Sequence, residues 1–133
     1  FGIDPSKIEE KISKSKRSIM PVHLFGQSCD MQNIVRIAKK HKLWLLDDAA
    51  HSFGAMYNGK PIGTQADATC FSFHPVKTIT TGEGGMVVTN NEKTAIGIQL
   101  STRPLKLSWA PSIMKKIIKK KSRKGLILAL ISL

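Results

Sequence analysis

A strand–helix–strand pattern between residues 18 and 46 constrains the fold more than any other feature of the sequence. Ser18–Phe25 has the apolar character of a buried strand, although Pro21 weakens it, and Met31–His41 has the periodicity of an amphipathic helix. Leu43–Leu46 is wholly apolar, as in strands that parallel sheets bury on both faces. Two strands joined by a helix form a βαβ unit, so we expect an α/β protein with a mostly parallel sheet flanked by helices.

Further short elements are expected on either side of this unit. Asp4 and Pro5 are typical of the start of a helix, here over Lys7–Ser13, and Asn58-Gly59 is a hairpin turn signal. Two more strands are predicted at Ala68–Phe73 and Met86–Thr89, and residues 90–92 could cap a further helix. No internal repeat is visible among these elements.

The charge of the chain is concentrated in its last third. Residues 1–92 hold 11 Lys+Arg and 9 Asp+Glu, whereas residues 93–133 hold 10 Lys+Arg and no acid. This break predicts a boundary near Glu92–Lys93, with a basic, divergent tail over 93–133. One interpretation of the tail is a poorly ordered or non-native extension. The alternative is a binding module, in which Ser112–Lys121 forms a basic amphipathic helix for RNA or an anionic membrane.

Three chemical features follow the predicted strands. Asp47 and Asp48 come directly after a buried strand, where α/β proteins place their chemistry, and they point to opposite faces. Lys77 lies in a loop after the next strand, beside the glycine-rich Gly82–Gly85, which lets the backbone approach a ligand. A desolvated lysine can form a Schiff base, and an aspartate can hold a pyridine nitrogen protonated.

Each of these residues also has a structural interpretation. Lys77 could be a solvated surface lysine, and the aspartate pair could cap a loop. His51 and His74 could be packed or surface histidines. The glycine-rich segment matches neither the dinucleotide fingerprint nor the phosphate-binding P-loop. The two cysteines have no metal-ligand spacing and make no disulfide framework, so we expect no metal and a reducing cytoplasm.

Three sequence blocks in order resemble one family. PVHLFGQ (residues 21–27), LLDDAAHSFGA (45–55) and FSFHPVKTITTGEGGMVVTN (71–90) look like the DegT/DnrJ/EryC1/StrS aminotransferases. These are pyridoxal-phosphate (PLP) enzymes of fold type I that aminate keto sugars on nucleotides. Residues 1–92 carry the resemblance, which implies part of a fold type I PLP-transferase large domain. Within the family, the blocks are most similar to enzymes that aminate C4 of UDP-4-keto-6-deoxy sugars.

The resemblance implies a role for four residues toward the cofactor. Lys77 matches the lysine that forms the Schiff base, and Asp48 matches the acid paired with the pyridine nitrogen. His51 matches a residue that contacts the ring near its phenolic oxygen, and Ser72 matches a serine that binds the phosphate. Asp47 stands where relatives usually have Glu.

Other residues of these blocks receive no cofactor role. His23 and Gln27 lie in a family block near the active site, but the resemblance assigns neither a function. Phe71, Phe73 and Val76 are expected to pack in the core.

The resemblance further implies a ping-pong transamination. An amino-acid donor, expected to be glutamate, displaces Lys77 and aminates the cofactor, while Lys77 moves a proton between the donor's α-carbon and the cofactor. The aminated cofactor then aminates a nucleotide-linked keto-sugar substrate, for polysaccharide or glycan precursor synthesis. General base catalysis of this kind contributes about 10²–10⁴-fold. Intact relatives are homodimers, and dimerisation is left open for this chain. We expect neither nucleic acid nor membrane as a partner.

The chain also departs from the family pattern. Relatives are far longer, with an N-terminal segment and a C-terminal domain that shape the site, and the start at Phe1 resembles the middle of a member. We therefore expect a large domain truncated at both ends. After Glu92, only Ala95–Leu100 resembles the family helix. A catalytically inactive fragment is the alternative to an active aminotransferase.

Overall fold

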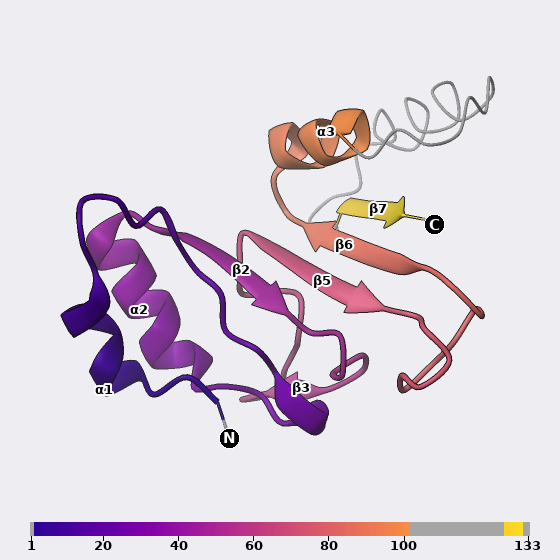
Figure 1. The fold of residues 1–133 in the computed structure, drawn as a ribbon, viewed down its shortest axis with the longest axis horizontal. Helices are drawn as coiled ribbons and strands as arrows, with labels where there is room; N and C mark the ends of the chain where they lie inside the picture. The colour runs from indigo at the N-terminus through magenta and orange to yellow at the C-terminus, as the bar shows by residue number, and fades with distance from the viewer. Residues whose placement is uncertain (1, 102–126, 132–133) are drawn as a thin grey trace.

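The computed structural model describes residues 2–101 and 127–131, which form a five-stranded sheet, a small hairpin and flanking helices (Figure 1). The strands of the sheet are β1 Ser18–Ile19, β2 Trp44–Asp48, β5 Ala68–Ser72, β6 Gly85–Thr89 and β7 Ile127–Ile131. The hairpin consists of β3 Met56–Tyr57 and β4 Lys60–Pro61. The helices are α1 Pro5–Ile8, α2 Met31–His41 and α3 Glu92–Ser101, with 3-10 turns η1 Glu9–Lys11 and η2 Leu24–Gly26.

The sheet has the order β1-β2-β5-β6-β7. Strands β1, β2 and β5 are parallel neighbours, while β6 runs antiparallel to both β5 and β7. Four of the five strands therefore share one direction, which confirms the expected α/β arrangement with a mostly parallel sheet. In Figure 1 the arrowheads of β2 and β5 point toward the same edge, so their following loops lie at one end of the sheet.

Helix α2 spans the predicted residues and forms the first core with β1 and β2. The side chain of Asp30 accepts a hydrogen bond from the Asn33 N–H and caps the helix, and Lys42 ends it in a left-handed conformation. Its apolar face is buried in a cluster of Ile8, Ile19, Cys29, Met31, Ile34, Ile37, Ala38, Leu45 and Ala66. This burial packs α2 against β1 and β2.

A second core lies on β5 and β6, next to the loop after β5. It consists of Ala49, Ile62, Phe71, Phe73 and Val88. Phe71 and Phe73 each lie edge-on to Phe53, with ring centroids 5.5 and 5.8 Å apart, so their expected packing is confirmed. The same expectation is wrong for Val76, which is 78% exposed because it lies in the loop beyond the strand.

The first predicted strand is much shorter than expected. Only Ser18–Ile19 forms β1, because Pro21 has no N–H to donate and the chain turns into η2 at Leu24. A single parallel bridge between Val22 and Asp48 continues the pairing beyond the proline. The segment after β1 therefore still lies against the carboxyl end of β2.

Strand β2 is buried on one face and partly open on the other, which corrects the expectation that it is buried on both. Leu45 and Asp47 point to the buried face, whereas Leu46 and Asp48 are half-buried and Trp44 is 50% exposed. The alternation follows from the pleat, which sends successive side chains to opposite faces. Asp47 and Asp48 consequently have different surroundings, as the sequence predicted.

The two turn predictions near the hairpin and the N-terminus are confirmed. Asn58 and Gly59 have φ of 48° and 72°, the positive values that a two-residue turn between β3 and β4 requires. The carboxylate of Asp4 accepts from the Ser6 N–H and starts α1 at Pro5. The helix is shorter than predicted and continues as η1.

Helix α3 crosses the predicted boundary at Glu92–Lys93. The side chain of Asn91 accepts from the Thr94 N–H, so residues 90–92 cap a helix as expected. Ile127–Ile131 pairs with the whole of β6. Ser112–Lys121, proposed above as an amphipathic helix, lies outside the described residues. The division at residue 93 stays a prediction, and none of the described helices is long and apolar enough to cross a membrane.

A charge cluster joins η1 to the end of α2 and predicts a pH effect. Glu9 Oε1 lies 2.8 Å from Lys40 Nζ and 2.6 Å from His41 Nε2, and these hydrogen bonds lower the pKa of Glu9 to about 2. A carboxyl whose pKa falls on folding stabilises the protein above its unfolded pKa, near 4.5, and loses that stabilisation as the pH drops toward 2.

A Glu9→Gln variant should therefore be slightly less stable than the unchanged chain at pH 6, and the difference should shrink progressively as the pH falls from 4.5 toward 2. Urea midpoints at pH 6, 4 and 2.5 measure this difference. The effect stays small because the pair is exposed and screened. An equal difference at all three pH values would contradict the assignment.

Candidate functional site

Two of the predicted site residues end neighbouring parallel strands. Asp48 is the last residue of β2 and lies level with Cys70 of β5. Ser72 ends β5 two residues further on, and so lies on the same face as Cys70 and Asp48. Both side chains are half-buried. This face of the sheet therefore presents a carboxylate and a hydroxyl from adjacent strands.

The loops after β2 and β5 bring two more predicted residues together. Lys77 Nζ lies 2.7 Å from His51 Nε2, and both side chains are half-buried. An ammonium has only donors, so protonated Lys77 donates to Nε2, and the imidazole proton then lies on Nδ1. Lys77 therefore has a specific hydrogen-bond partner and is not a freely solvated surface lysine.

The remaining contacts of these four residues are local. The Asp48 carboxylate accepts from the Ala50 N–H at 3.1 Å, one residue before His51. The Ser72 hydroxyl accepts from the His74 N–H at 3.4 Å. Within the described residues, neither Asp48 nor Ser72 makes a hydrogen bond to Lys77. The site therefore holds one direct pair, Lys77–His51, with Asp48 and Ser72 available to other groups.

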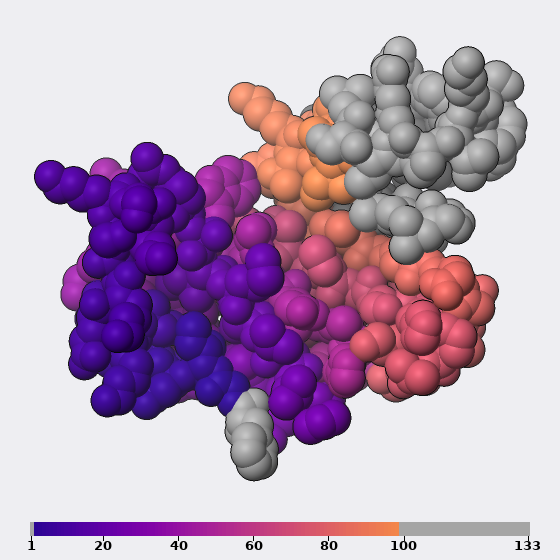
Figure 2. Space-filling view, viewed as in Figure 1, coloured from indigo at the N-terminus to yellow at the C-terminus, as the bar shows by residue number. Residues whose placement is uncertain are grey.

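The loop that carries Lys77 is closed by its own backbone. Phe73 donates its N–H to the Gly84 carbonyl at 2.9 Å, and its carbonyl accepts from Thr81 N–H and the Thr80 hydroxyl. Gly82 and Gly84 have φ of 83° and 142°, which explains the glycine-rich sequence. Figure 2 shows this loop, in salmon, on the right side of the molecule, away from the indigo N-terminal residues.

Gly85 marks a close approach between β6 and β5 beside Ser72. A Cβ at Gly85 would lie 2.9 Å from the Phe71 carbonyl oxygen, and a backbone atom cannot move aside as a side chain can. We expect Gly85→Ala to lower the free energy of unfolding by about 1–3 kcal/mol in urea denaturation. Gly97→Ala is the control: it has open space in α3 and should stabilise by up to about 1 kcal/mol. Equal stability of the two variants would contradict this packing.

An aromatic residue that sequence reasoning did not single out lies beside His51. The Phe25 ring is edge-on to the His51 ring, with centroids 5.9 Å apart, and the side chain is 80% exposed. Phe25 also has a φ of 53°, which is uncommon for a bulky residue. Phe25 therefore contacts the imidazole of the Lys77–His51 pair.

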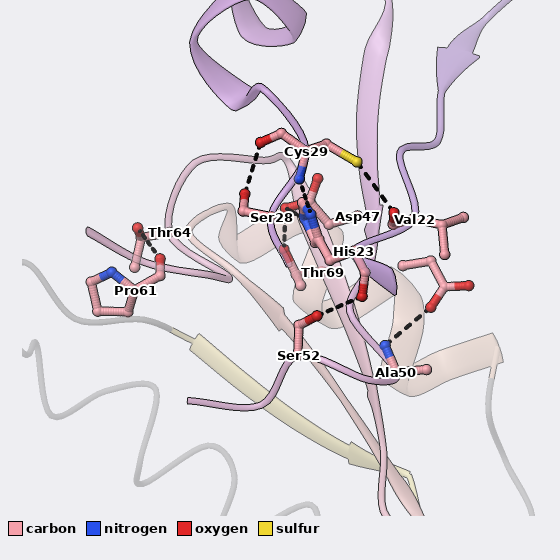
Figure 3. Close-up of polar contacts among 11 residues, drawn as sticks. Val22, His23, Ser28, Cys29, Asp47, Ala50, Ser52, Pro61, Thr64 and Thr69 are labelled. Carbon is pink, nitrogen blue, oxygen red and sulfur yellow. Dashed lines mark hydrogen bonds and ion pairs between the residues drawn. The ribbon is translucent and has the colours of Figure 1, made fainter. Parts of the chain in front are cut away.

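Behind the site, a buried polar cluster holds His23 and Asp47 (Figure 3). His23 Nδ1 accepts from the Cys29 N–H at 3.1 Å, and Nε2 lies 3.5 Å from Asp47 Oδ2. The same carboxylate oxygen accepts from the Thr69 hydroxyl at 3.2 Å. Strand alternation predicted that Asp47 faces away from Asp48, but no local signal identified its partner, because His23 lies 24 residues earlier in the sequence.

The two cysteines remain free thiols with pKa values above the ordinary one. Burial raises the pKa of Cys29, and the charge of Asp47 adds to it. Desolvation likewise raises the pKa of Cys70, which the carboxylates of Asp48 and Asp47 raise further. Both thiols are therefore neutral at pH 7, and Cys70 presents no nucleophilic thiolate beside Asp48.

Comparison with known proteins gives one consistent result. The model of the DegT/DnrJ/EryC1/StrS aminotransferase family matches residues 1–103. GDP-perosamine synthase of Escherichia coli O157:H7 is 53% identical over 87 residues, which are 65% of this chain and 24% of that protein. The chain spans about a quarter to a third of the length of the curated relatives it matches.

Solved structures agree with the sequence relatives. PseC of Helicobacter pylori, an aminotransferase involved in the biosynthesis of pseudoaminic acid, superposes with a TM-score of 0.73 at 37% identity, over 74% of this chain and 27% of that one. NtdA of Bacillus subtilis, with the bound cofactor PMP, has a TM-score of 0.64 at 41% identity, over 69% of this chain and 20% of that one.

Proposed function

The chain belongs to the DegT/DnrJ/EryC1/StrS aminotransferase family, and on that premise we propose that its described residues form part of the PLP site of a sugar aminotransferase. The observation that carries the proposal is the Lys77–His51 pair, 2.7 Å apart at the carboxyl end of the sheet. Around it lie a carboxylate, a hydroxyl and a glycine-rich loop, a set of groups that suits a phosphorylated pyridine aldehyde.

The residues present fit this cofactor in their chemistry. Lys77 supplies an amine for the aldehyde, Asp48 an anion for the pyridine nitrogen, and Ser72 a hydroxyl for the phosphate. The Asp48 carboxylate accepts one hydrogen bond from the Ala50 N–H and can accept further hydrogen bonds. PLP, when bound, acts as an electron sink that stabilises a carbanion at the amino-acid carbon.

The residues of the chain then hold and move protons. His51 accepts a hydrogen bond from protonated Lys77 at Nε2, so it orients the lysine and can take up a proton from it. The negative charge of Asp48 would favour the protonated form of a pyridine nitrogen placed beside it. The Lys77 amine would act as the base that takes a proton from the α-carbon of the amino donor.

The substrate class is the finer part of the proposal. We propose a nucleotide-linked keto sugar as acceptor and an amino acid, glutamate, as donor, in the synthesis of polysaccharide or glycan precursors. The name of the similar perosamine synthase supports a nucleotide-sugar product. The free thiols Cys29 and Cys70 support a reducing cytoplasm as the location.

Reductive trapping tests the proposal with the chain as it exists. The chain is incubated with PLP, reduced with borohydride and mapped by mass spectrometry. We expect the phosphopyridoxyl group on Lys77 in preference to exposed lysines such as Lys39 and Lys42, and we expect Lys77→Arg to remove it.

Even labelling of all exposed lysines by PLP would overturn the proposed site. Lysine labelling that is selective for Lys77, without release of 2-oxoglutarate from added glutamate, would support the cofactor site and favour the inactive-fragment alternative. Selective labelling together with 2-oxoglutarate release would support the full proposal. A circular dichroism spectrum of each variant confirms that the labelled protein is folded.

A further inference from the structure

His23 is fully enclosed, yet neither the family resemblance nor the proposed chemistry gives it a role. It is 1% exposed, and its neighbours Asp47, Ser52 and Thr69 are each 2% exposed or less. Figure 3 shows the imidazole between Cys29 and Asp47, with Ser52 reaching the His23 backbone. Buried polar side chains are in the great majority hydrogen-bonded, so the partners of this ring indicate its role.

The hydrogen bonds of the ring define its protonation. Cys29 donates its N–H to Nδ1, so Nδ1 carries no proton, and the ring proton lies on Nε2. Nε2 lies 3.5 Å from Asp47 Oδ2 and has no hydrogen-bond partner in the described part of the chain. The ring is thus held at Nδ1 by the loop before α2, and its Nε2 side lies beside the buried carboxylate of strand β2.

The backbone of His23 reaches the proposed cofactor site. Its N–H donates to the Asp48 carbonyl at 2.9 Å, and the Asp48 N–H donates to the Pro21 carbonyl at 2.9 Å. Its carbonyl accepts from the Ser52 hydroxyl at 2.6 Å. Ser52 directly follows His51 in the chain. His23 is therefore joined on one side to Asp48 and on the other to the loop that carries His51.

We propose that His23 is a positioning residue that fixes Asp48 and His51 relative to each other. The ring lies against Asp47 on the buried face of β2. The backbone of the same residue bonds to the Asp48 carbonyl and to the Ser52 hydroxyl. The ring adds a side-chain contact beside the single backbone bridge, Val22–Asp48, that continues the strand pairing beyond Pro21. The consequence for cofactor binding rests on the proposed function, but the positioning itself does not.

The test compares amide hydrogen exchange in His23→Ala, His23→Asn and the unchanged chain. Asparagine carries an amide oxygen near the position of Nδ1, so it can still accept from the Cys29 N–H. In His23→Ala we expect exchange at the amides of Asp48 and Ser52 to quicken about tenfold or more, with a smaller change in α2. His23→Asn should restore a large part of the protection.

The control is Ile37→Ala, which removes part of a buried side chain from α2 but none of the groups that form hydrogen bonds with His23. It should quicken exchange in α2 more than at Asp48. Equal acceleration of α2 and Asp48 in His23→Ala, or unchanged exchange at Asp48, would overturn the proposal. If His23→Ala does not fold, His23→Asn decides: unprotected Asp48 and Ser52 amides in a folded His23→Asn chain overturn it, and protected ones support it.

PLP trapping at Lys77 gives a second readout that a purely structural role would not move. At matched folded fraction, His23→Ala should lower the yield at Lys77 while Ile37→Ala leaves it unchanged, and His23→Asn should recover it. Suppose that hydrogen exchange at Asp48 and Ser52 quickens in His23→Ala as expected, but PLP is trapped in no variant and not in the unchanged chain. That outcome would overturn the proposed function and still support the positioning role.

Discussion

An Asp48→Asn variant is expected to bind PLP about 10- to 100-fold more weakly than the unchanged chain and to unfold at nearly the same urea concentration. Hydrogen bonds to charged groups contribute about 1.5–3 kcal/mol, and the amide removes the charge that would hold a protonated pyridine nitrogen. The amide oxygen can still accept from the Ala50 N–H, so the turn after β2 is kept. The fold loses little because Asp48 is half-buried on the open face of the sheet.

Absorbance titration with PLP measures the affinity, and urea denaturation followed by circular dichroism measures the stability. Ser72→Ala is a useful comparison, because it removes a hydroxyl from the same face without changing the charge. We expect it to weaken binding less than Asp48→Asn does. Unchanged affinity in Asp48→Asn would show that this carboxylate does not face the cofactor. A large drop in stability would instead show a structural role.

Local patterns were sufficient to predict most of the elements near the site. The 3.6-residue periodicity predicted α2, and Asn58-Gly59 predicted the hairpin, because these signals act over a few residues. The pairing of Lys77 with His51 follows from a more general rule: loops after neighbouring parallel strands meet at one edge of the sheet. The resemblance supplied the roles of these residues, which geometry leaves as proposals.

Long-range contacts account for what could not be predicted. The burial of His23 depends on Cys29, Asp47 and Ser52, which are 6 to 29 residues away. The exposure of Trp44 depends on which other segments cover the open face of β2, and the sequence of residues 43–46 does not show that. Proline shortened β1 as its missing N–H implies, but the bridge from Val22 to Asp48 that continues the contact is visible only in three dimensions.

Replacement of Asp47 by alanine should lower the stability of the fold, whereas Asp48→Asn should mainly lower the affinity for PLP. Asp47 is 2% exposed, lies 3.5 Å from the His23 ring and accepts from the Thr69 hydroxyl. Its removal leaves the Thr69 hydroxyl and the His23 Nε2–H buried without an acceptor, which costs about 1–3 kcal/mol for each group. That is a large part of the roughly 5–15 kcal/mol that stabilises a typical domain.

Asp47→Asn is the matched control for this prediction, because its amide oxygen can still accept the hydrogen bond from the Thr69 hydroxyl. We expect it to cost about 1–3 kcal/mol, less than Asp47→Ala. Urea denaturation at pH 7 measures both variants. If Asp47→Ala were as stable as the unchanged chain, the buried cluster would contribute nothing to the fold. Since strand alternation sends these adjacent aspartates to opposite faces, stability should follow residue 47, and cofactor affinity in the folded protein should follow residue 48.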